Sequence, residues 1–474
     1  MDYKSLVRNS ITAFLAQTVS IGLSVVTTIV VPKVLGVSEF GYWQLFIFYV
    51  SYAGFFHLGL SDGVYLLNGG LSRESIDRKS INSQFWFGLA YEIPISLLIV
   101  ISAYASDLEQ DRKFVLAAFA LFIVLNNCCF YLGFIFQAIN ETKIYSYSVM
   151  VDRLVFLVPL LALLMVRSQD FRLYILAYCV SKICSLVYCI SKGRFILTSG
   201  VKRFREILKD GFMSVRVGIK VLLANTASML IIGIMRFVID AQWGIEEFGK
   251  VSFSLSLVNF ILFFVQQVSM VLFPALRRAD RSEVISIYSR VQDVLDFVAP
   301  YVYLIYYPAQ LILAWWLPDY AVSLTFFAVL LPICVFDAKM EIGCATLFKV
   351  LRMEKTWLLI NVGTVCLSAL FVGIGATMFG SVVYAIVGMV LALMARSVFS
   401  EYLLSKQLEV PFSHLTIINV IVSLAFSVIA FLFPVRLSFV IYIVIVVLYT
   451  ITNKEQIKTL AHLMNKLIGN MRAL

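Results

Sequence analysis

The sequence predicts an all-α polytopic membrane protein, built from two six-helix lobes that repeat each other and two further helices near the C-terminal end. Of its 474 residues, 61% are apolar and only 14% are charged. The apolar residues fall in runs of roughly 20, the length that a helix needs to cross the hydrocarbon core of a bilayer. The gaps between these runs are short, so we expect no soluble catalytic domain.

Read in order, the apolar runs predict about fourteen membrane-spanning helices. They lie near residues 10–31, 41–62, 82–104, 114–138, 145–166, 172–191, 214–237, 249–275, 292–316, 321–347, 357–379, 382–405, 414–433 and 436–452. We expect five parts: an N-lobe (1–191), a basic amphipathic cytoplasmic linker (192–213), a C-lobe (214–407), helices thirteen and fourteen (408–452), and an amphipathic cytoplasmic tail helix (453–474).

The distribution of basic residues predicts the orientation. Lys and Arg are retained on the cytoplasmic side of a membrane, and most of the 38 basic residues fall in alternate loops that include both ends of the chain. We therefore predict cytoplasmic termini in the inner membrane of a bacterium. The net charge of +10 then reflects topology and attraction to anionic membrane lipid, and it is not evidence for nucleic-acid binding.

Cysteine and histidine usage gives no sign of a metal or cofactor. The eight cysteines all lie in apolar runs without a C-x-x-C spacing, and we interpret them as small packing residues. The three histidines, His57, His414 and His462, lie far apart in the sequence. We therefore expect neither a metal site nor a cofactor.

An internal repeat is visible at a constant offset. Gly36, Glu39, Phe40 and Gly41 of one hexapeptide recur as Gly244, Glu247, Phe248 and Gly249 of another, an offset of 244 − 36 = 208 residues. Because the first and seventh helices are six apart, both run in the same direction through the membrane. The sequence thus predicts parallel repeats related by an axis along the membrane normal, with the substrate path at their interface.

A stripe of polar residues follows the same offset. Its members are Gln17, Ser20, Ser24 and Thr28 in the first helix and Asn225, Ser228 and Arg236 in the seventh. Their spacing of three or four residues places them on one face of each helix. Hydrogen bonding between helices is one interpretation of such a stripe. The charge of Arg236 favours the other interpretation, a water-filled cavity.

The segment from Val31 to Gly36, followed by Ser38 to Trp43 at the start of the second helix, resembles the polysaccharide flippases, including the O-antigen flippases. This family belongs to a superfamily that also contains multidrug extruders and the lipid II flippase. The resemblance covers about the first twelve helices. It implies alternating-access transport of a polyprenyl-pyrophosphate-linked oligosaccharide for lipopolysaccharide or another surface polysaccharide. Polysaccharide polymerase and chain-length proteins are the protein partners that it implies.

Basic residues inside the predicted helices are candidates for substrate binding. Each costs roughly 2.5–3.5 kcal/mol at a helix centre and therefore needs water or a partner. Such residues are Arg153, Lys182, Arg216, Lys220, Arg236, Lys339 and Arg396. We predict that they line a cationic cavity for pyrophosphate and acidic sugars. Arg216 and Lys220 have an alternative role as snorkelling residues, and Arg153 has one as the partner of a nearby carboxylate.

Embedded carboxylates suggest coupling to protons. Glu92 and Asp337 are the candidates, with salt bridging as the alternative. Asp337 and Glu341 share a helix face, whereas Lys339 lies on another. A local pair within this helix is therefore not the simple explanation of the three charges.

Two rival functions follow from the same pattern. A multidrug exporter of the superfamily would carry a carboxylate in its first lobe, and the first helix here has none between Ser10 and Val31. A cationic cavity also suits cationic drugs poorly. A membrane-embedded polysaccharide polymerase would present a large outer loop, and the predicted outer loops are short. We therefore predict a transporter and not an enzyme; the sequence contains no linear signature of the sugar unit.

Overall fold

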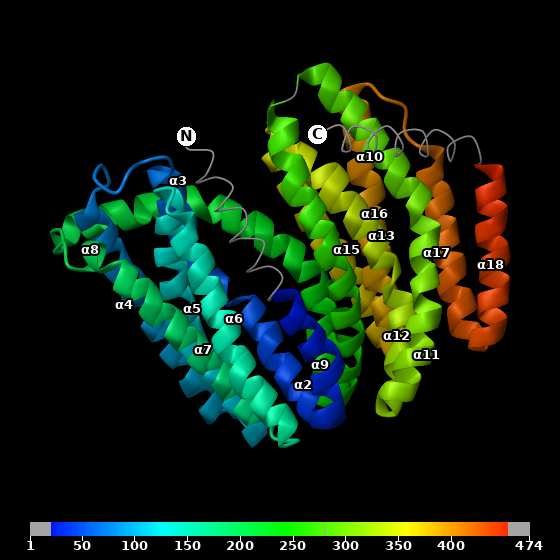
Figure 1. Cartoon of the computed structure of the whole chain (residues 1–474), viewed down its shortest axis with the longest axis horizontal. Coiled ribbons are helices and arrows are strands. Elements are labelled where there is room, and N and C mark those ends of the chain that lie inside the picture. Colours follow the sequence, from blue (N-terminus) through cyan, green and yellow to red (C-terminus); the bar gives the residue numbers. More distant parts are fainter. Residues whose placement is uncertain (1–19, 279, 454–474) are drawn as a thin grey trace. The chain divides into compact units, whose positions relative to one another are not determined.

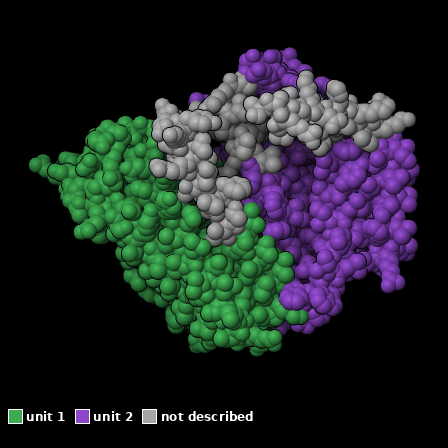
Figure 2. All heavy atoms as spheres, viewed as in Figure 1, with its two compact units in different colours: residues 1–226 green, residues 227–474 purple. Residues whose placement is uncertain are grey.

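A computed structural model describes residues 20–278 and 280–453 of the chain, and these residues are organised as helices without strands (Figure 1). Among them, 12 helical segments are long and apolar enough to cross a membrane. The predicted class, a polytopic all-α membrane protein, is therefore confirmed. The chain divides into two compact units, residues 1–226 and 227–474 (Figure 2).

The first unit contains the helices of the predicted N-lobe. Their bounds are η1 Val26–Val30, α2 Val31–Ser51, η2 Ala53–His57, α3 Leu60–Asn68, α4 Arg78–Ala105, α5 Gln110–Ala138, α6 Thr142–Met165, α7 Phe171–Lys192, α8 Arg194–Leu197 and the first part of α9 Phe204–Arg278. Helix α5 lies at the centre of the unit, because it contacts α2, α3, α4, α6 and α7.

The second unit continues α9 and adds the remaining helices. They are α10 Arg281–Val302, η3 Tyr303–Ile305, α11 Tyr306–Trp316, η4 Pro318–Tyr320, α12 Ala321–Leu330, α13 Pro332–Ala338, η5 Lys339–Ala345, α14 Thr346–Val350, α15 Glu354–Thr377, α16 Val382–Leu408, α17 His414–Leu432 and α18 Val435–Thr452. Helix α16 contacts α12, α13, η5 and α15, and α17 packs on α10 and α12. The predicted helices thirteen and fourteen are α17 and α18.

Two of the 12 spanning segments are broken by the glycines of the repeated hexapeptide. Gly36 has φ 74° and ψ 179° within α2, and Gly244 has φ 79° and ψ −172° within α9. This backbone conformation is open to glycine and strained for other residues. Each break separates two of the predicted helices within one long segment. The 12 observed segments therefore correspond to the fourteen predicted helices. The first half of the predicted first helix and the predicted tail helix lie outside the described residues, apart from Asn453.

Two helices begin earlier than their apolar runs predict. The ninth was placed at 292–316, but α10 begins at Arg281, where Asp280 Oδ1 accepts a hydrogen bond of 3.0 Å from the backbone N–H of Glu283. The seventh was placed at 214–237, but α9 begins at Phe204. Both extensions interrupt their apolar residues with charged ones, so a search for apolar runs misses them. At α10, the cap by Asp280 favours the earlier start.

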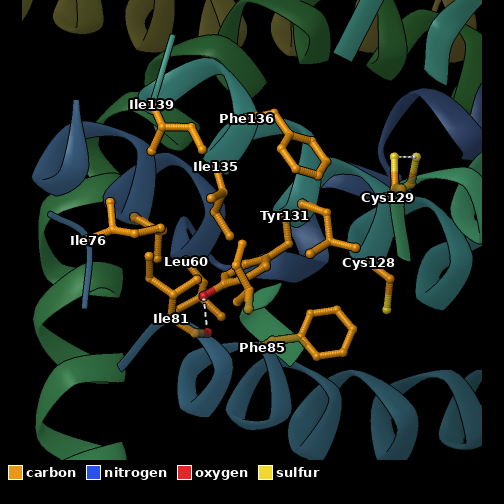
Figure 3. Close-up of a cluster of buried hydrophobic side chains, with 14 residues drawn as sticks. Leu60, Ile76, Ile81, Phe85, Cys128, Cys129, Tyr131, Ile135, Phe136 and Ile139 are labelled. Atoms are coloured by element: carbon orange, nitrogen blue, oxygen red, sulfur yellow. Dashed lines mark hydrogen bonds between the residues drawn. The ribbon is translucent and has the colours of Figure 1, made fainter. Parts of the chain in front are cut away.

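One core cluster of the first unit consists of apolar side chains that come mainly from α3, α4 and α5, with one residue each from α7 and α8 (Figure 3). Tyr131 lies within it, and its hydroxyl donates a hydrogen bond of 2.7 Å to the carbonyl oxygen of Ile81. Cys129 and Cys189 also belong to this cluster, and their sulfur atoms lie 3.7 Å apart. These cysteines pack inside the unit, in keeping with the interpretation of the cysteines as packing residues.

The start of α9 packs so closely on α3 that the two backbones are in contact. A methyl group placed on Gly218 would lie 1.9 Å from the carbonyl oxygen of Gly59, and one placed on Gly63 would lie 1.9 Å from that of Ser214. Only glycine permits this approach at Gly218 and Gly63. The contact explains why the first unit extends to residue 226, beyond the predicted linker at 192–213.

The linker itself is held by ion pairs. Lys202 Nζ lies 2.7 Å from Asp77 Oδ2 and 2.9 Å from Asp210 Oδ2. The pKa of Lys202 is raised, chiefly by its hydrogen bond to Asp77. These contacts fix the turn between α8 and α9 against the start of α4.

Candidate functional site

The second unit contains a cavity of about 170 Å³ lined by residues from α9, α13, η5, α15 and α16. Polar groups of both signs face it, together with one aromatic ring and several apolar side chains. The polar and aromatic residues are Ser228, Gln266, Asp337, Glu341, Trp357 and Arg396. Within this unit, the cavity combines concave shape with charged side chains, which is the usual character of a ligand site.

Arg396 is fixed at the wall of this cavity. Its Nη2 donates to Asp337 Oδ1 at 2.6 Å and its Nη1 donates to Ser228 Oγ at 3.1 Å. Glu341 also lines the cavity, four residues after Asp337. The described residues contain no cation within ion-pair distance of Glu341. Both carboxylates line the cavity, in keeping with the shared helix face that their spacing predicts.

Lys339 points to the other side of the same helix. Its Nζ lies 2.6 Å from Asp296 Oδ1 and 2.7 Å from Glu401 Oε2, and all three side chains are at most 2% exposed. Lys339 Nζ also donates to Thr416 Oγ1 at 2.7 Å. One ammonium thus balances two buried carboxylates in a cluster outside the cavity, and Lys339 is not among the cavity residues.

Helix α17 is tied to this cluster by residues that the sequence did not single out as functional. Thr416 Oγ1 donates to Glu401 Oε1 at 2.7 Å, and Asn419 Nδ2 donates to Asp296 Oδ1 at 2.9 Å. Thr416, Asn419 and Ser423 are spaced as one helix face within a very apolar segment. That polar face could have predicted the contact of α17 with the rest of the protein, because polar residues in a lipid-embedded helix face its protein neighbours.

In the first unit, Lys182 of α7 pairs with Asp152 of α6. Lys182 Nζ lies 2.8 Å from Asp152 Oδ2, and Ser181 Oγ donates to Asp152 Oδ1 at 3.0 Å. Arg153 follows Asp152 and hydrogen-bonds Tyr178. The structure therefore brings these two predicted cations close to one carboxylate at the α6 and α7 pairing.

The remaining predicted cations lie on α9. Arg236 Nη2 donates to Ser252 Oγ at 2.9 Å, and its guanidinium lies 4.8 Å from the ring centre of Phe248. Arg216 and Lys220 are exposed. A shared substrate-binding role of the seven cations stays a prediction.

The predicted polar stripe is partly described. Gln17 lies outside the described residues, Ser20 and Ser24 are half-buried, and Thr28 is buried. In the second repeat Asn225 is exposed, whereas Ser228 binds Arg396 at the cavity. Ser228 therefore joins the described part of the stripe to this cavity.

Glu92 of α4 is 4% exposed and lines a small cavity of about 10 Å³ with Ser61, Asn127 and Tyr131. It contacts the side chain of Asn127. No cation of the described part of the chain lies within ion-pair distance of this carboxylate. A volume of this size holds about one water molecule, so the site matches a single proton or small ion and not an organic substrate.

The repeated hexapeptides place their glutamates differently. Glu39 Oε2 accepts a hydrogen bond of 3.1 Å from the backbone N–H of Phe171, at the first residue of α7. Glu247 instead pairs with Lys250 on its own helix at 2.7 Å. Gly41 and Gly249 are both buried. The backbone break is thus shared by the two repeats, but the contact of the glutamate is not.

The chain matches no family model, and no curated protein matches it by sequence. Solved structures do match its fold. An inward-facing multidrug resistance MATE family transporter of the MOP superfamily superposes with TM-score 0.61 at 12% identity, over 83% of this chain and 94% of that chain. The lipid II flippase MurJ, in an inward closed conformation, gives TM-score 0.56 at 13% identity, over 95% of this chain and 100% of that chain.

A MOP superfamily transporter from Pyrococcus furiosus, described by a reverse polarity of its binding pocket, gives TM-score 0.51 at 12% identity over 86% of this chain and 96% of that chain. At such identities the likeness establishes the fold. The chain therefore has the fold of the membrane transporters of the MOP superfamily. Both drug transporters and a lipid flippase share this fold.

Proposed function

We propose that this protein is a flippase that moves a polyprenyl-pyrophosphate-linked oligosaccharide, such as an O-antigen repeat unit, from the inner to the outer leaflet of a bacterial inner membrane. It would work by alternating access and in concert with polysaccharide polymerase and chain-length proteins. Transport and not catalysis is the function that the fold of its structural neighbours supports.

One observation carries the choice of a lipid-linked substrate. The lipid II flippase superposes on 95% of this chain, whereas the MATE transporter superposes on 83%. The ion cluster around Lys339 ties α17 firmly to α10 and α16, so the additional helices are an integral part of the second unit. The MATE transporter has the higher TM-score, 0.61 against 0.56, so it is the greater length of the match, which extends over 95% of this chain, that supports the flippase.

The embedded cations supply the chemistry for the lipid pyrophosphate. Arg153, Lys182 and Arg236 would bind its oxygens, because guanidinium and ammonium groups form charge-assisted hydrogen bonds to phosphate. Arg396, the fourth embedded cation of this set, is already paired with Asp337. Movement of an uncompensated polyanion out of an inside-negative cell is favoured by about 2.3 kcal/mol per charge per 100 mV. The membrane potential can thus drive the proposed direction of transport.

Depletion of the protein tests this function. We expect lipid-linked repeat units to accumulate on the inner leaflet, where an impermeant glycosidase added outside cannot reach them. Accumulation of flipped but unpolymerised units would instead indicate a polymerase. Charge reversal by Lys182→Glu or Arg236→Glu should abolish complementation of a depleted strain. The matched control is Lys355→Glu, at an exposed position of α15. Full complementation by well-expressed reversed variants would contradict the role of these cations.

Glu92 and Asp337 are the proposed coupling residues if protons assist transport. Glu92 has a buried cavity of single-water size beside it, and Asp337 faces the larger cavity. We expect Glu92→Gln to keep the fold and to remove the dependence of transport on a pH gradient. A gradient dependence equal to that of the unchanged protein would exclude Glu92.

A multidrug exporter is the second candidate, and the carboxylates of the cavity favour it. Asp337 and Glu341 face the cavity beside Trp357, and carboxylates with an aromatic ring suit organic cations. Expression of the protein in a strain lacking its own drug exporters should then raise resistance to cationic dyes. Unchanged susceptibility, with accumulation of lipid-linked glycan on depletion, would leave the flippase as the sole candidate.

A further inference from the structure

The cavity of the second unit has a charge balance that an acidic ligand does not match. Its wall presents two carboxylates, Asp337 and Glu341, and one guanidinium, Arg396. That guanidinium is already engaged by Asp337 and Ser228 at 2.6 Å and 3.1 Å. An anion entering the cavity would displace the Asp337 pair and would still face Glu341. The cavity therefore disfavours phosphates and uronic acids by like-charge repulsion.

The volume narrows the class of ligand further. About 170 Å³ is available, whereas pockets for drug-sized molecules occupy roughly 300–1,000 Å³. A polycyclic cation therefore exceeds the cavity. One six-membered sugar ring with its hydroxyl groups is of the right size.

The lining supplies both kinds of contact that a sugar ring uses. Glu341 and the second oxygen of Asp337 are acceptors for hydroxyl or amino donors, and the amide of Gln266 both donates and accepts. Trp357 and Met340 offer apolar surface to the C–H groups of a ring. A single concave site thus combines an excess of acceptors with an aromatic wall.

We propose that this cavity binds one sugar ring of the transported glycan, a ring that is neutral or carries a protonated amino group, and rejects an acidic sugar. The proposal rests on the flippase function and assigns its sugar selectivity to the second unit. Glu341 is the residue that determines specificity, because its carboxylate faces the cavity without a cation of the described chain beside it. Trp357 packs against the ring.

The test is a binding titration on the purified full-length protein in nanodiscs at about pH 6.5. The probes are glucosamine, glucose and glucuronate, followed by tryptophan fluorescence. We expect glucosamine to bind more tightly than glucose, and glucuronate to bind at least tenfold more weakly than glucosamine. Glucuronate binding as tight as that of glucosamine would overturn the proposal, and so would the absence of binding by all three sugars.

Two matched variants test whether the sugar preference arises in the cavity or at the nearby surface. Glu341→Gln should remove the preference for glucosamine over glucose, a loss of about tenfold that corresponds to one charged hydrogen bond. The control is Glu354→Gln, an exposed carboxylate at the start of α15 and three residues from Trp357, and it should keep the preference. Equal effects of the two substitutions would overturn the assignment to the cavity. Trp357→Phe should abolish the fluorescence change while Glu341→Gln leaves it measurable.

The titration tests the sugar selectivity and the depletion experiment tests the flippase function, so one proposal can be rejected while the other is kept. Accumulation of lipid-linked glycan on depletion, together with tight glucuronate binding, would keep the flippase and reject the selectivity. Tight binding of tetraphenylphosphonium that needs Glu341, with no binding of sugars, would reject the proposal in favour of drug transport. The predicted sugar preference without any accumulation on depletion would keep a sugar site and reject the lipid-linked cargo.

Discussion

The two units share a backbone feature but differ in their buried charges. Gly36 and Gly244 break their helices with nearly the same dihedral angles. In the first unit, the described residues place no cation within ion-pair distance of the buried Glu92, and Lys182 pairs with a single carboxylate. The second unit surrounds Lys339 with two carboxylates and places a further ion pair at its cavity. The two hexapeptides thus share the interruption of the helix, while the buried charges of the two units differ.

The largest expected effect comes from removal of the shared ammonium in the second unit. Lys339→Met leaves Asp296 and Glu401 buried without their cation, and loss of one partner of a buried ion pair costs about 3–5 kcal/mol. We expect a marked fall in the thermal unfolding midpoint in detergent. The triple variant Lys339→Met, Asp296→Asn, Glu401→Gln removes the charges together and should recover most of the loss. An unchanged midpoint for Lys339→Met alone would show that the cluster is not a unit of stability.

A substitution in the first unit should rank second. Gly218→Ala places a methyl group 1.9 Å from the carbonyl oxygen of Gly59, and such overpacking costs about 1–3 kcal/mol. The control is Gly363→Ala in α15, where a methyl group meets no atom within 4 Å and helix propensity improves by about 1 kcal/mol. Unfolding midpoints of the two variants should move in opposite directions. Equal shifts would contradict the close contact between α9 and α3.

The repeated glycines offer a test of equivalence. Both Gly36→Ala and Gly244→Ala force a side chain into an extended conformation with positive φ, at about 1–3 kcal/mol each. Neither glycine has an atom within 4 Å of the added methyl group, so backbone strain alone should act. We therefore expect equal shifts in thermal stability. A difference much larger than the error would show that the two breaks have diverged in energy.

The smallest effect should distinguish the two glutamates of the repeat. Glu39→Gln weakens a charged hydrogen bond to the first backbone N–H of α7, and we expect a loss of about 0.5–1 kcal/mol. Glu247→Gln breaks a pair with Lys250 on one helix, which contributes about 0.3–0.5 kcal/mol. Stability measured in detergent should therefore fall more for Glu39→Gln. The reverse order would place the stronger contact in the second repeat.

Sequence patterns predicted those features that depend on one helix at a time. Runs of apolar residues located the spanning helices, and spacing separated the face of Asp337 and Glu341 from that of Lys339. Pairing between helices was beyond such patterns. The partners of Lys339 lie on α10 and α16, which are distant in sequence. Glu401 lies near the end of its apolar run, and no sequence pattern marked it as a partner of Lys339. The position of Trp357 at the cavity likewise depends on how α15 packs against other helices, which its sequence pattern does not indicate.

Helix α9 contains the boundary between the two units. Its first part is fixed to α3 by the contact of Gly218 with Gly59, and its continuation past residue 226 belongs to the second unit. Between these parts the chain reads Ala224 to Ser228, without glycine or proline. The chain therefore passes from the first unit into the second inside a helix and not through a loop.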